Sequence, residues 1–139
     1  MKLITSNLLK FAIFFALGSI LFRFGLSWSI SNHAVFEMWI FAILYFIFNA
    51  GIGWFFGKQD YESFPLNDIG VRFHFVTYVV FNILWELWFL FGLNSRVENV
   101  IIAHQIAFFW GILLLLHFII YLFNRRNTIK GLDKSEIFE

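Results

Sequence analysis

Four long apolar stretches constrain this chain more than any other feature of its sequence. They cover residues 8–29, 35–56, 71–93 and 100–123. A helix needs about 20 mostly apolar residues to cross the hydrocarbon layer of a bilayer, so each stretch can span a membrane once. Hydrophobic residues make up 60% of the chain and charged residues 14%, which leaves too little polar surface for a water-soluble domain. The sequence therefore predicts a single all-α integral membrane domain, a four-helix bundle of two antiparallel hairpins.

The distribution of basic residues predicts how the spans are oriented. With four spans, both termini lie on the same side as the loop 57–70 and the tail 124–139. Eight of the 10 Lys and Arg residues belong to that side, and only Arg23 and Arg96 belong to the other half. Lys and Arg are enriched in cytoplasmic loops. We therefore expect both termini, the loop and the tail to be cytoplasmic.

The composition also excludes several classes of function. The net charge is +1 at pH 7, which is too small for a surface that binds nucleic acid. The chain has no Cys, and therefore neither a thiol nucleophile nor a thiolate metal site. It also lacks an H-E-x-x-H motif and a G-x-S-x-G motif. We predict that the protein is not an enzyme, with no catalytic residue and no metal site.

Polar residues at four-residue spacing mark the third span: His74, Tyr78, Asn82 and Glu86. Residues four apart lie on one helix face and drift by about 40° around the helix at each step. The four side chains therefore form a slanted polar ridge. Because unpaired polar groups are costly in lipid, we expect this ridge to face the bundle interior or a wet cavity.

Antiparallel folding of the last two spans predicts which polar groups share a depth. His74 and His117 fall level with each other towards the cytoplasmic side, and with Tyr78 they form an inner polar layer. An outer polar layer consists of Arg23, Glu37, Glu86, His104 and Gln105. One interpretation of the outer layer is a neutralised charge cluster that holds the helices in register. The other is a proton or ion pathway in which Glu86 titrates and His104 relays the proton.

The inner layer has two interpretations as well. Two imidazoles at one depth can ligate the iron of haem b axially, with His74, Tyr78, Asn82 and His117 as the candidate cofactor-binding residues. Packed helices lie only about 8–10 Å apart, so the two helices would have to splay or lie diagonally to admit a porphyrin. The structural interpretation is that both histidines hydrogen-bond Tyr78, Asn82 or backbone groups.

Glycines within the spans predict sites of close helix packing. Gly51 and Gly53 lie in the second span, and Gly111 follows Trp110 in the fourth. Small residues let helix backbones approach each other in a membrane. We expect these glycines to pack against neighbouring helices.

Residues 70–124 carry polar and aromatic residues at set spacings. The pattern comprises Phe73-His74, Tyr78 and Asn82 on one helix, and Trp110-Gly111 followed by His117 on the next. In these residues the C-terminal half resembles the bacterial two-transmembrane (2TM) domain family, a helical hairpin. The chain departs from the family in its acidic lead-in at residues 60–65 and in the phase of Phe73. The first two spans have no counterpart in that family.

The resemblance implies a bacterial inner-membrane protein. Members of the family occur alone or joined to sensor histidine kinases and related regulatory proteins, which implies a sensing or anchoring role. The resemblance also implies that His74, Tyr78, Asn82 and His117 are the functional residues.

We therefore expect a non-enzymatic sensory, regulatory or assembly module of the membrane. Its expected partners are the lipid bilayer and a membrane or cytoplasmic signalling protein. A b-type haem protein with His74 and His117 as axial ligands is one alternative. An oligomeric proton or ion channel or transporter is the second, in which a homodimer would supply eight spans.

Overall fold

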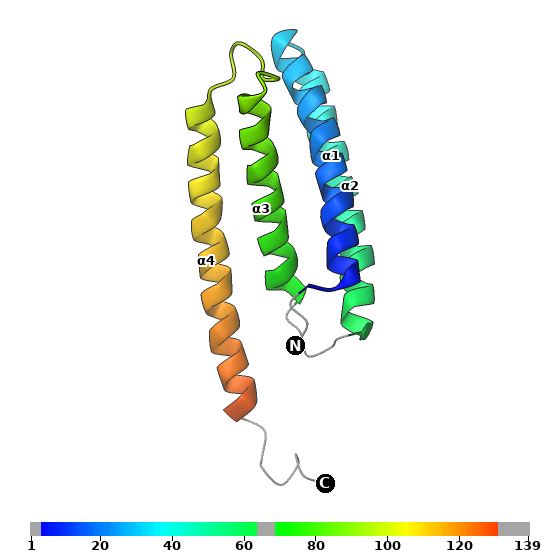
Figure 1. The fold of residues 1–139 in the computed structure, drawn as a ribbon, viewed down its shortest axis with the longest axis vertical. Helices are drawn as coiled ribbons and strands as arrows, with labels where there is room; N and C mark the ends of the chain where they lie inside the picture. Colours follow the sequence, from blue (N-terminus) through cyan, green and yellow to red (C-terminus); the bar gives the residue numbers. More distant parts are fainter. Residues whose placement is uncertain (1–3, 64–68, 131–139) are drawn as a thin grey trace.

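The computed structural model describes residues 4–63 and 69–130 and is helical (Figure 1). Its helices are α1 (Ser6–Ser31), α2 (Val35–Ser63), α3 (Ile69–Leu90) and α4 (Val100–Lys130). All four are long and apolar enough to cross a membrane. The prediction of an all-helical chain with four such helices is confirmed, and the described residues include no strand.

The boundaries of α1 and α2 follow from local chemistry. The Oγ1 of Thr5 accepts a hydrogen bond from the Leu8 amide at 3.2 Å, which caps the start of α1. The tight turn into α2 places His33 at φ +53°, in the left-handed region. Helix α2 continues to Ser63 and takes up half of the expected loop 57–70. Pro65 is the only proline in the sequence, and a proline disfavours helical backbone at the residue before it.

The α3–α4 connection is a compact loop of residues 91–99. Helix α3 ends at Leu90, three residues earlier than predicted, and Gly92 follows at φ +64°. Glycine adopts this left-handed conformation without steric cost. The Oδ1 of Asn99 accepts a hydrogen bond from the Ile101 amide at 2.9 Å, so Asn99 caps α4. At its other end α4 runs on to Lys130, into the predicted tail 124–139. Residues 64–68 of the loop and 131–139 of the tail lie outside the described residues.

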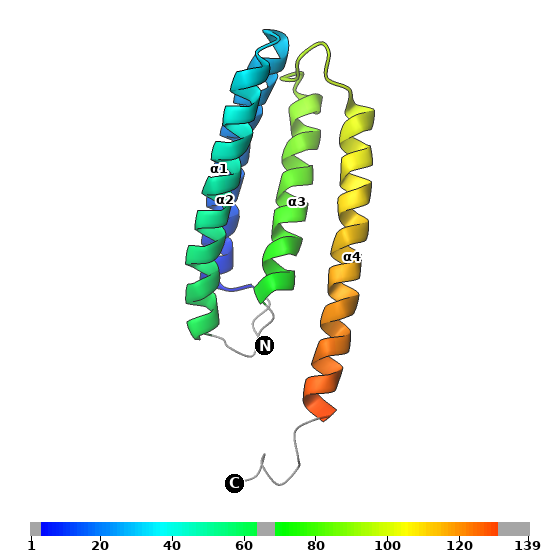
Figure 2. The same ribbon diagram turned by 180° about the vertical axis from the view of Figure 1, so that it is seen from behind.

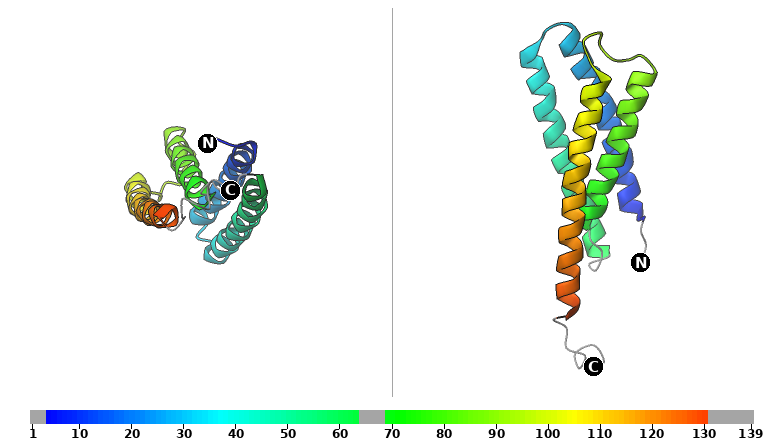
Figure 3. Two further views of the ribbon diagram at one scale, coloured as in Figure 1. Left: turned by 90° about the horizontal axis from the view of Figure 1, so that it is seen from below. Right: turned by 90° about the vertical axis from the view of Figure 1, so that its left-hand side faces the viewer.

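The helices are not packed equally. Helix α1 packs against α2 and α3, α2 also contacts α3, and α4 packs against α3 alone. Helix α3 lies between α4 on one side and the α1–α2 pair on the other, both from behind (Figure 2) and along the helices (Figure 3, left). The buried core consists of Leu8, Phe11, Phe15, Phe56 and Phe73. The core therefore belongs to the first three helices, and α4 lies at the edge.

The glycines that permit close packing are not the expected ones in α2. A Cβ on Gly51 or Gly53 would meet nothing within 4 Å, so the expectation for these two positions is wrong. A Cβ on Gly18 of α1 would lie 2.4 Å from the Phe48 ring, and α1 and α2 approach closely there. Gly111 does pack against a neighbour, because a Cβ there would lie 3.0 Å from the Tyr78 hydroxyl of α3.

Candidate functional site

Helix α1 carries a polar stripe that consists of Ser19, Arg23, Ser27 and Ser31, of which the first three are buried. These residues are four apart, so they share one helix face. Ser19, Arg23 and Ser27 are 1%, 2% and 8% exposed. Ser19 Oγ donates to the Phe15 carbonyl at 2.8 Å and lies 2.8 Å from the Tyr45 hydroxyl of α2. The α1 stripe therefore faces protein along most of its length.

Arg23 is the charged centre of the α1 stripe. Its Nη2 donates to Oε2 of Glu98 at 2.7 Å, and the Glu98 side chain is only 8% exposed. The guanidinium also lies over the Trp85 ring of α3, 3.9 Å from the ring centroid. A cation over an indole face is attracted to it, more strongly when both are away from water. Arg23 is thus neutralised by a carboxylate and covered by aromatic rings.

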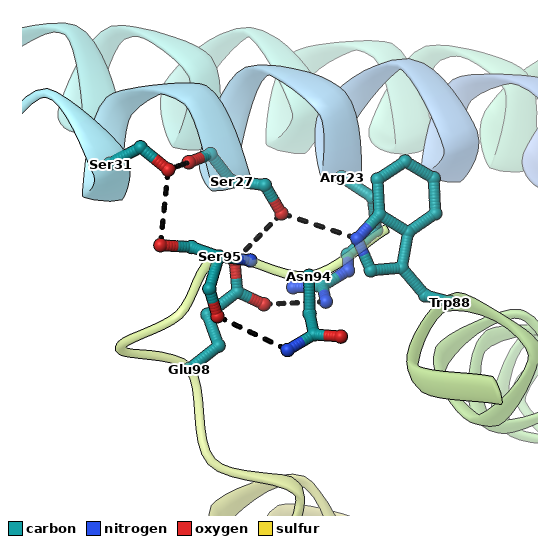
Figure 4. A network of polar contacts seen from close by, with 7 residues as sticks. All are labelled: Arg23, Ser27, Ser31, Trp88, Asn94, Ser95 and Glu98. Carbon is teal, nitrogen blue, oxygen red and sulfur yellow. Dashed lines mark hydrogen bonds and ion pairs between the residues drawn. The ribbon is translucent and has the colours of Figure 1, made fainter. Parts of the chain in front are cut away.

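Glu98 receives further donors from α1 and from its own loop (Figure 4). Its Oε1 accepts from Ser27 Oγ at 2.7 Å and from the Ser95 amide at 3.2 Å. The indole Nε1 of Trp88 donates to Ser27 Oγ at 3.2 Å, and Ser31 Oγ donates to Ser95 Oγ at 3.0 Å. The hydrogen bonds to the Glu98 carboxylate are charge-assisted, and such bonds are roughly twice as strong as neutral ones. The network therefore fixes the α3–α4 loop against the end of α1.

Sequence reasoning missed Glu98 as the partner of Arg23. It grouped Arg23 with Glu37, Glu86, His104 and Gln105, whereas the structure places Arg23 beside the loop carboxylate. Glu37 and Gln105 are exposed. The spacing of Ser19, Ser27 and Ser31 around Arg23 could have revealed the α1 stripe, because it repeats every four residues just as the ridge of α3 does.

A second buried ion pair lies near the opposite end of the helices. Asp60 of α2 is fully buried, and its Oδ2 accepts from Arg72 Nη1 at 3.1 Å. Arg72 Nη2 also donates to the Thr5 hydroxyl at 3.4 Å. This pair joins the start of α1, the end of α2 and the start of α3. Asp60 lies in the segment that the sequence assigned to a loop, and Arg72 lies at the start of the predicted third span.

The outer part of the α3 ridge is open to the surroundings. His104 Nε2 of α4 lies 2.7 Å from Glu86 Oε1 of α3, and the two side chains are 58% and 57% exposed. Glu86 lies one turn from the end of α3, and His104 lies one turn from the start of α4. The sequence placed these two residues at one depth, and the structure brings them into contact. This contact lies at the edge of the structure and does not include Arg23, which is paired with Glu98.

The inner histidines also meet. The ring centroids of His74 and His117 are 5.1 Å apart at an interplanar angle of 66°. Both side chains are exposed. Two axial ligands of haem would have the macrocycle plane between them, whereas these rings are in edge-to-face contact. The pair in this arrangement does not fit a haem unless α3 and α4 move apart.

Between these two contacts, Tyr78 belongs to the α3–α4 seam and Asn82 is bonded within α3. The Tyr78 ring packs edge-on against Trp110, with centroids 5.9 Å apart, and its hydroxyl lies against Gly111. Asn82 Nδ2 donates to the Tyr78 carbonyl at 2.7 Å. These contacts favour a packing role for the middle of the ridge.

An apolar cleft of about 790 Å³ lies beside this seam, on the side of the start of α1. Its walls include Leu8, Phe75, Leu114 and Phe118. Within the described residues, no group of three or more His, Asp or Glu side chains could hold a metal ion. The polar chemistry of the site is therefore that of hydrogen bonds and ion pairs between helices.

Comparison with known proteins finds no relative of this chain. No model of a known protein family matches it, and neither a curated protein nor a solved structure does so.

Proposed function

We propose that this chain is a non-enzymatic integral membrane module that assembles with another membrane chain through the open edge of α3 and α4. The observation that carries this proposal is the exposure of the Glu86–His104 pair, at 57% and 58%. We call this pair the polar edge.

The polar edge is costly if lipid is its only neighbour. Ionisable side chains within spanning segments almost always face protein or a water-filled cavity, because hydrocarbon offers them no hydrogen bonds. Asparagine, glutamine and histidine side chains also hydrogen-bond between helices in membranes. Arg23 and Asp60 follow this rule, since both are buried and paired. A protein partner would give the polar edge the same protection.

Apolar exposure alone would not support this proposal. The surface of α4 is largely apolar and exposed, with examples at Ile101, Phe108 and Leu113. Such residues are satisfied by lipid, because acyl chains are as apolar as they are. The polar edge therefore indicates assembly, whereas the aromatic and aliphatic surface around it does not.

The proposal includes a bacterial inner membrane and cytoplasmic termini. The excess of Lys and Arg on the side of the termini supports this orientation. The resemblance of residues 70–124 to the 2TM family supports a sensory or regulatory setting for the assembly.

A photoreactive phenylalanine analogue tests the proposal in intact membranes. Phe108 lies one turn after His104 on α4 and is 65% exposed, while Phe46 of α2 is 72% exposed and serves as the matched control. We expect the probe at position 108 to form a discrete protein adduct that Glu86→Gln weakens, and the probe at position 46 to label only lipid. Lipid labelling alone at both positions would contradict the proposal.

A further inference from the structure

We infer that the partner of the polar edge is a second copy of this chain, related by a two-fold axis along the membrane normal. This inference rests on the proposed function and names the partner of the same surface. It arises from two observations: the way α4 is packed and the hydrogen-bonding groups of the polar edge that are not paired within the structure.

Helix α4 uses a single face within the structure. Its partly buried residues recur every three to four positions, at Ala103, Ala107, Trp110 and Leu114. Since α4 packs against α3 alone, this face is the one that contacts α3. His104 lies beside this face and is exposed, whereas Gln105 is exposed on the opposite side of α4. A neighbouring helix could therefore approach the polar edge without disturbing the α3–α4 contact.

The polar edge retains both donors and acceptors. Their contact uses one carboxylate oxygen of Glu86 and one ring nitrogen of His104. Among the described residues, the second oxygen of Glu86 and the second nitrogen of His104 have no partner. A carboxylate oxygen accepts hydrogen bonds, and an imidazole nitrogen donates or accepts according to its tautomer. The surface is therefore able to bind another surface of the same composition.

A second copy supplies the complementary groups at the correct depth. A two-fold rotation about the membrane normal keeps every residue at its own depth in the bilayer. It would place the carboxylate of each Glu86–His104 pair near the imidazole of its counterpart. Two-fold dimers with such self-complementary surfaces are the commonest assemblies of identical chains. An unrelated partner would have to present matching polar groups at this depth independently.

Disulfide trapping tests this inference directly, because the chain has no Cys of its own. Ile101 lies about one turn before His104 on α4 and is 59% exposed, and Ile43 on α2 is 55% exposed. A disulfide requires the two Cα atoms to be within about 7 Å. We expect Ile101→Cys in oxidised membranes to give a dimer of the chain that Ile43→Cys does not give. No dimer from Ile101→Cys, or equal dimer from both variants, would overturn the inference.

An exchange of the two side chains tests whether the polar edge is what holds the dimer together. Glu86→Gln should weaken dimer formation by about tenfold, given the modest strength of hydrogen bonds between helices in membranes. The double variant Glu86→His with His104→Glu keeps both groups and should restore the dimer. Glu37→Gln, at an exposed carboxylate of α2, is the matched control and should leave the dimer unchanged. Failure of the exchange to restore the dimer would count against the inference.

Crosslinking in cells that express two differently tagged copies of the chain distinguishes this inference from the proposed function. If the probe at position 108 captures the other tagged copy, both stand. If it forms an adduct with a different protein that depends on Glu86, the second copy is excluded and the proposed function stands. If it labels only lipid, both fail.

Discussion

Helices α1 and α3 each carry four polar residues at four-residue spacing, but the two sets have opposite surroundings. Along α1, Ser19, Arg23 and Ser27 are buried, and Arg23 is paired with Glu98. Along α3, the ridge begins at exposed His74 and ends at exposed Glu86, and both ends contact histidines of α4. The same spacing therefore serves to hold the chain together in one helix and to present polar groups outward in the other.

The difference between these helices arises from what packs beside them. Helix α1 is covered by α2 and α3 and by the α3–α4 loop, whereas the far side of α3 is covered by α4 alone. One helix cannot enclose a ridge that drifts by about 120° over its length. Spacing thus identifies a polar face, and the number of neighbouring helices decides whether that face is closed.

The largest expected effect comes from removing the charge at the centre of the α1 stripe. Arg23→Leu leaves the buried carboxylate of Glu98 without its cation, and we expect the free energy of unfolding to fall by about 3–5 kcal/mol. Unfolding in detergent micelles, followed by circular dichroism, measures the change. A loss below about 1 kcal/mol would place this pair among ordinary surface ion pairs.

The double variant Arg23→Leu with Glu98→Leu sharpens this test. Replacement of both members of a buried ion pair by apolar residues is often close to neutral. We expect the double variant to recover much of the stability that Arg23→Leu loses. A double variant that is less stable than the single one would show that Glu98 acts mainly through Ser27 and Ser95.

An intermediate effect is expected at the α3–α4 seam. Gly111→Leu would force a side chain against the Tyr78 hydroxyl, where even a Cβ lies at 3.0 Å. Overpacking of this kind costs about 1–3 kcal/mol, measured as a loss in the free energy of unfolding. Gly53→Leu is the control, because nothing lies within 4 Å of a Cβ there. Equal losses for the two variants would contradict the described packing of α4.

A smaller effect is expected at Ser27. Its hydroxyl donates to Glu98 and accepts from Trp88, so Ser27→Ala removes one hydrogen bond and leaves the indole N–H without its acceptor. We expect a loss of about 1 kcal/mol in the same unfolding measurement, together with a shift in Trp fluorescence. Ser63→Ala, whose hydroxyl bonds to its own helix at an exposed site, should change neither quantity.

The smallest effect on folding is expected at Glu86. Its pair with His104 is more than half exposed, and exposed ion pairs contribute about 0–1 kcal/mol. Glu86→Gln should therefore leave the unfolding of the dilute, detergent-solubilised chain almost unchanged. A loss as large as that of Arg23→Leu would show that Glu86 supports the fold of the single chain, and the contrast between the two helices would disappear.

The sequence was sufficient to predict the spans and the contacts between neighbours in the chain. Hydropathy identified four helices, and antiparallel folding of the last two placed His74 near His117 and Glu86 near His104. These contacts depend only on residue counting along two joined helices. Such counting is reliable because the rise per residue is fixed.

The partner of Arg23 could not be predicted in the same way. Glu98 belongs to the loop 91–99, and its position depends on how the loop folds back over α1. Similarly, the burial of Asp60 depends on α2 continuing to Ser63, which hydropathy did not predict. Depth arithmetic applies to spans and does not extend to loops or to helix ends in polar sequence.

The distance in sequence between Arg23 and Glu98, 75 residues, has a consequence for biogenesis. The first hairpin enters the bilayer before the carboxylate that neutralises its arginine has been synthesised. During that interval, the arginine must remain with the insertion machinery, with water or with lipid headgroups. We therefore expect a nascent chain arrested after Ser63 to be held by the translocon or degraded, and to be released into the membrane only when the third and fourth helices follow.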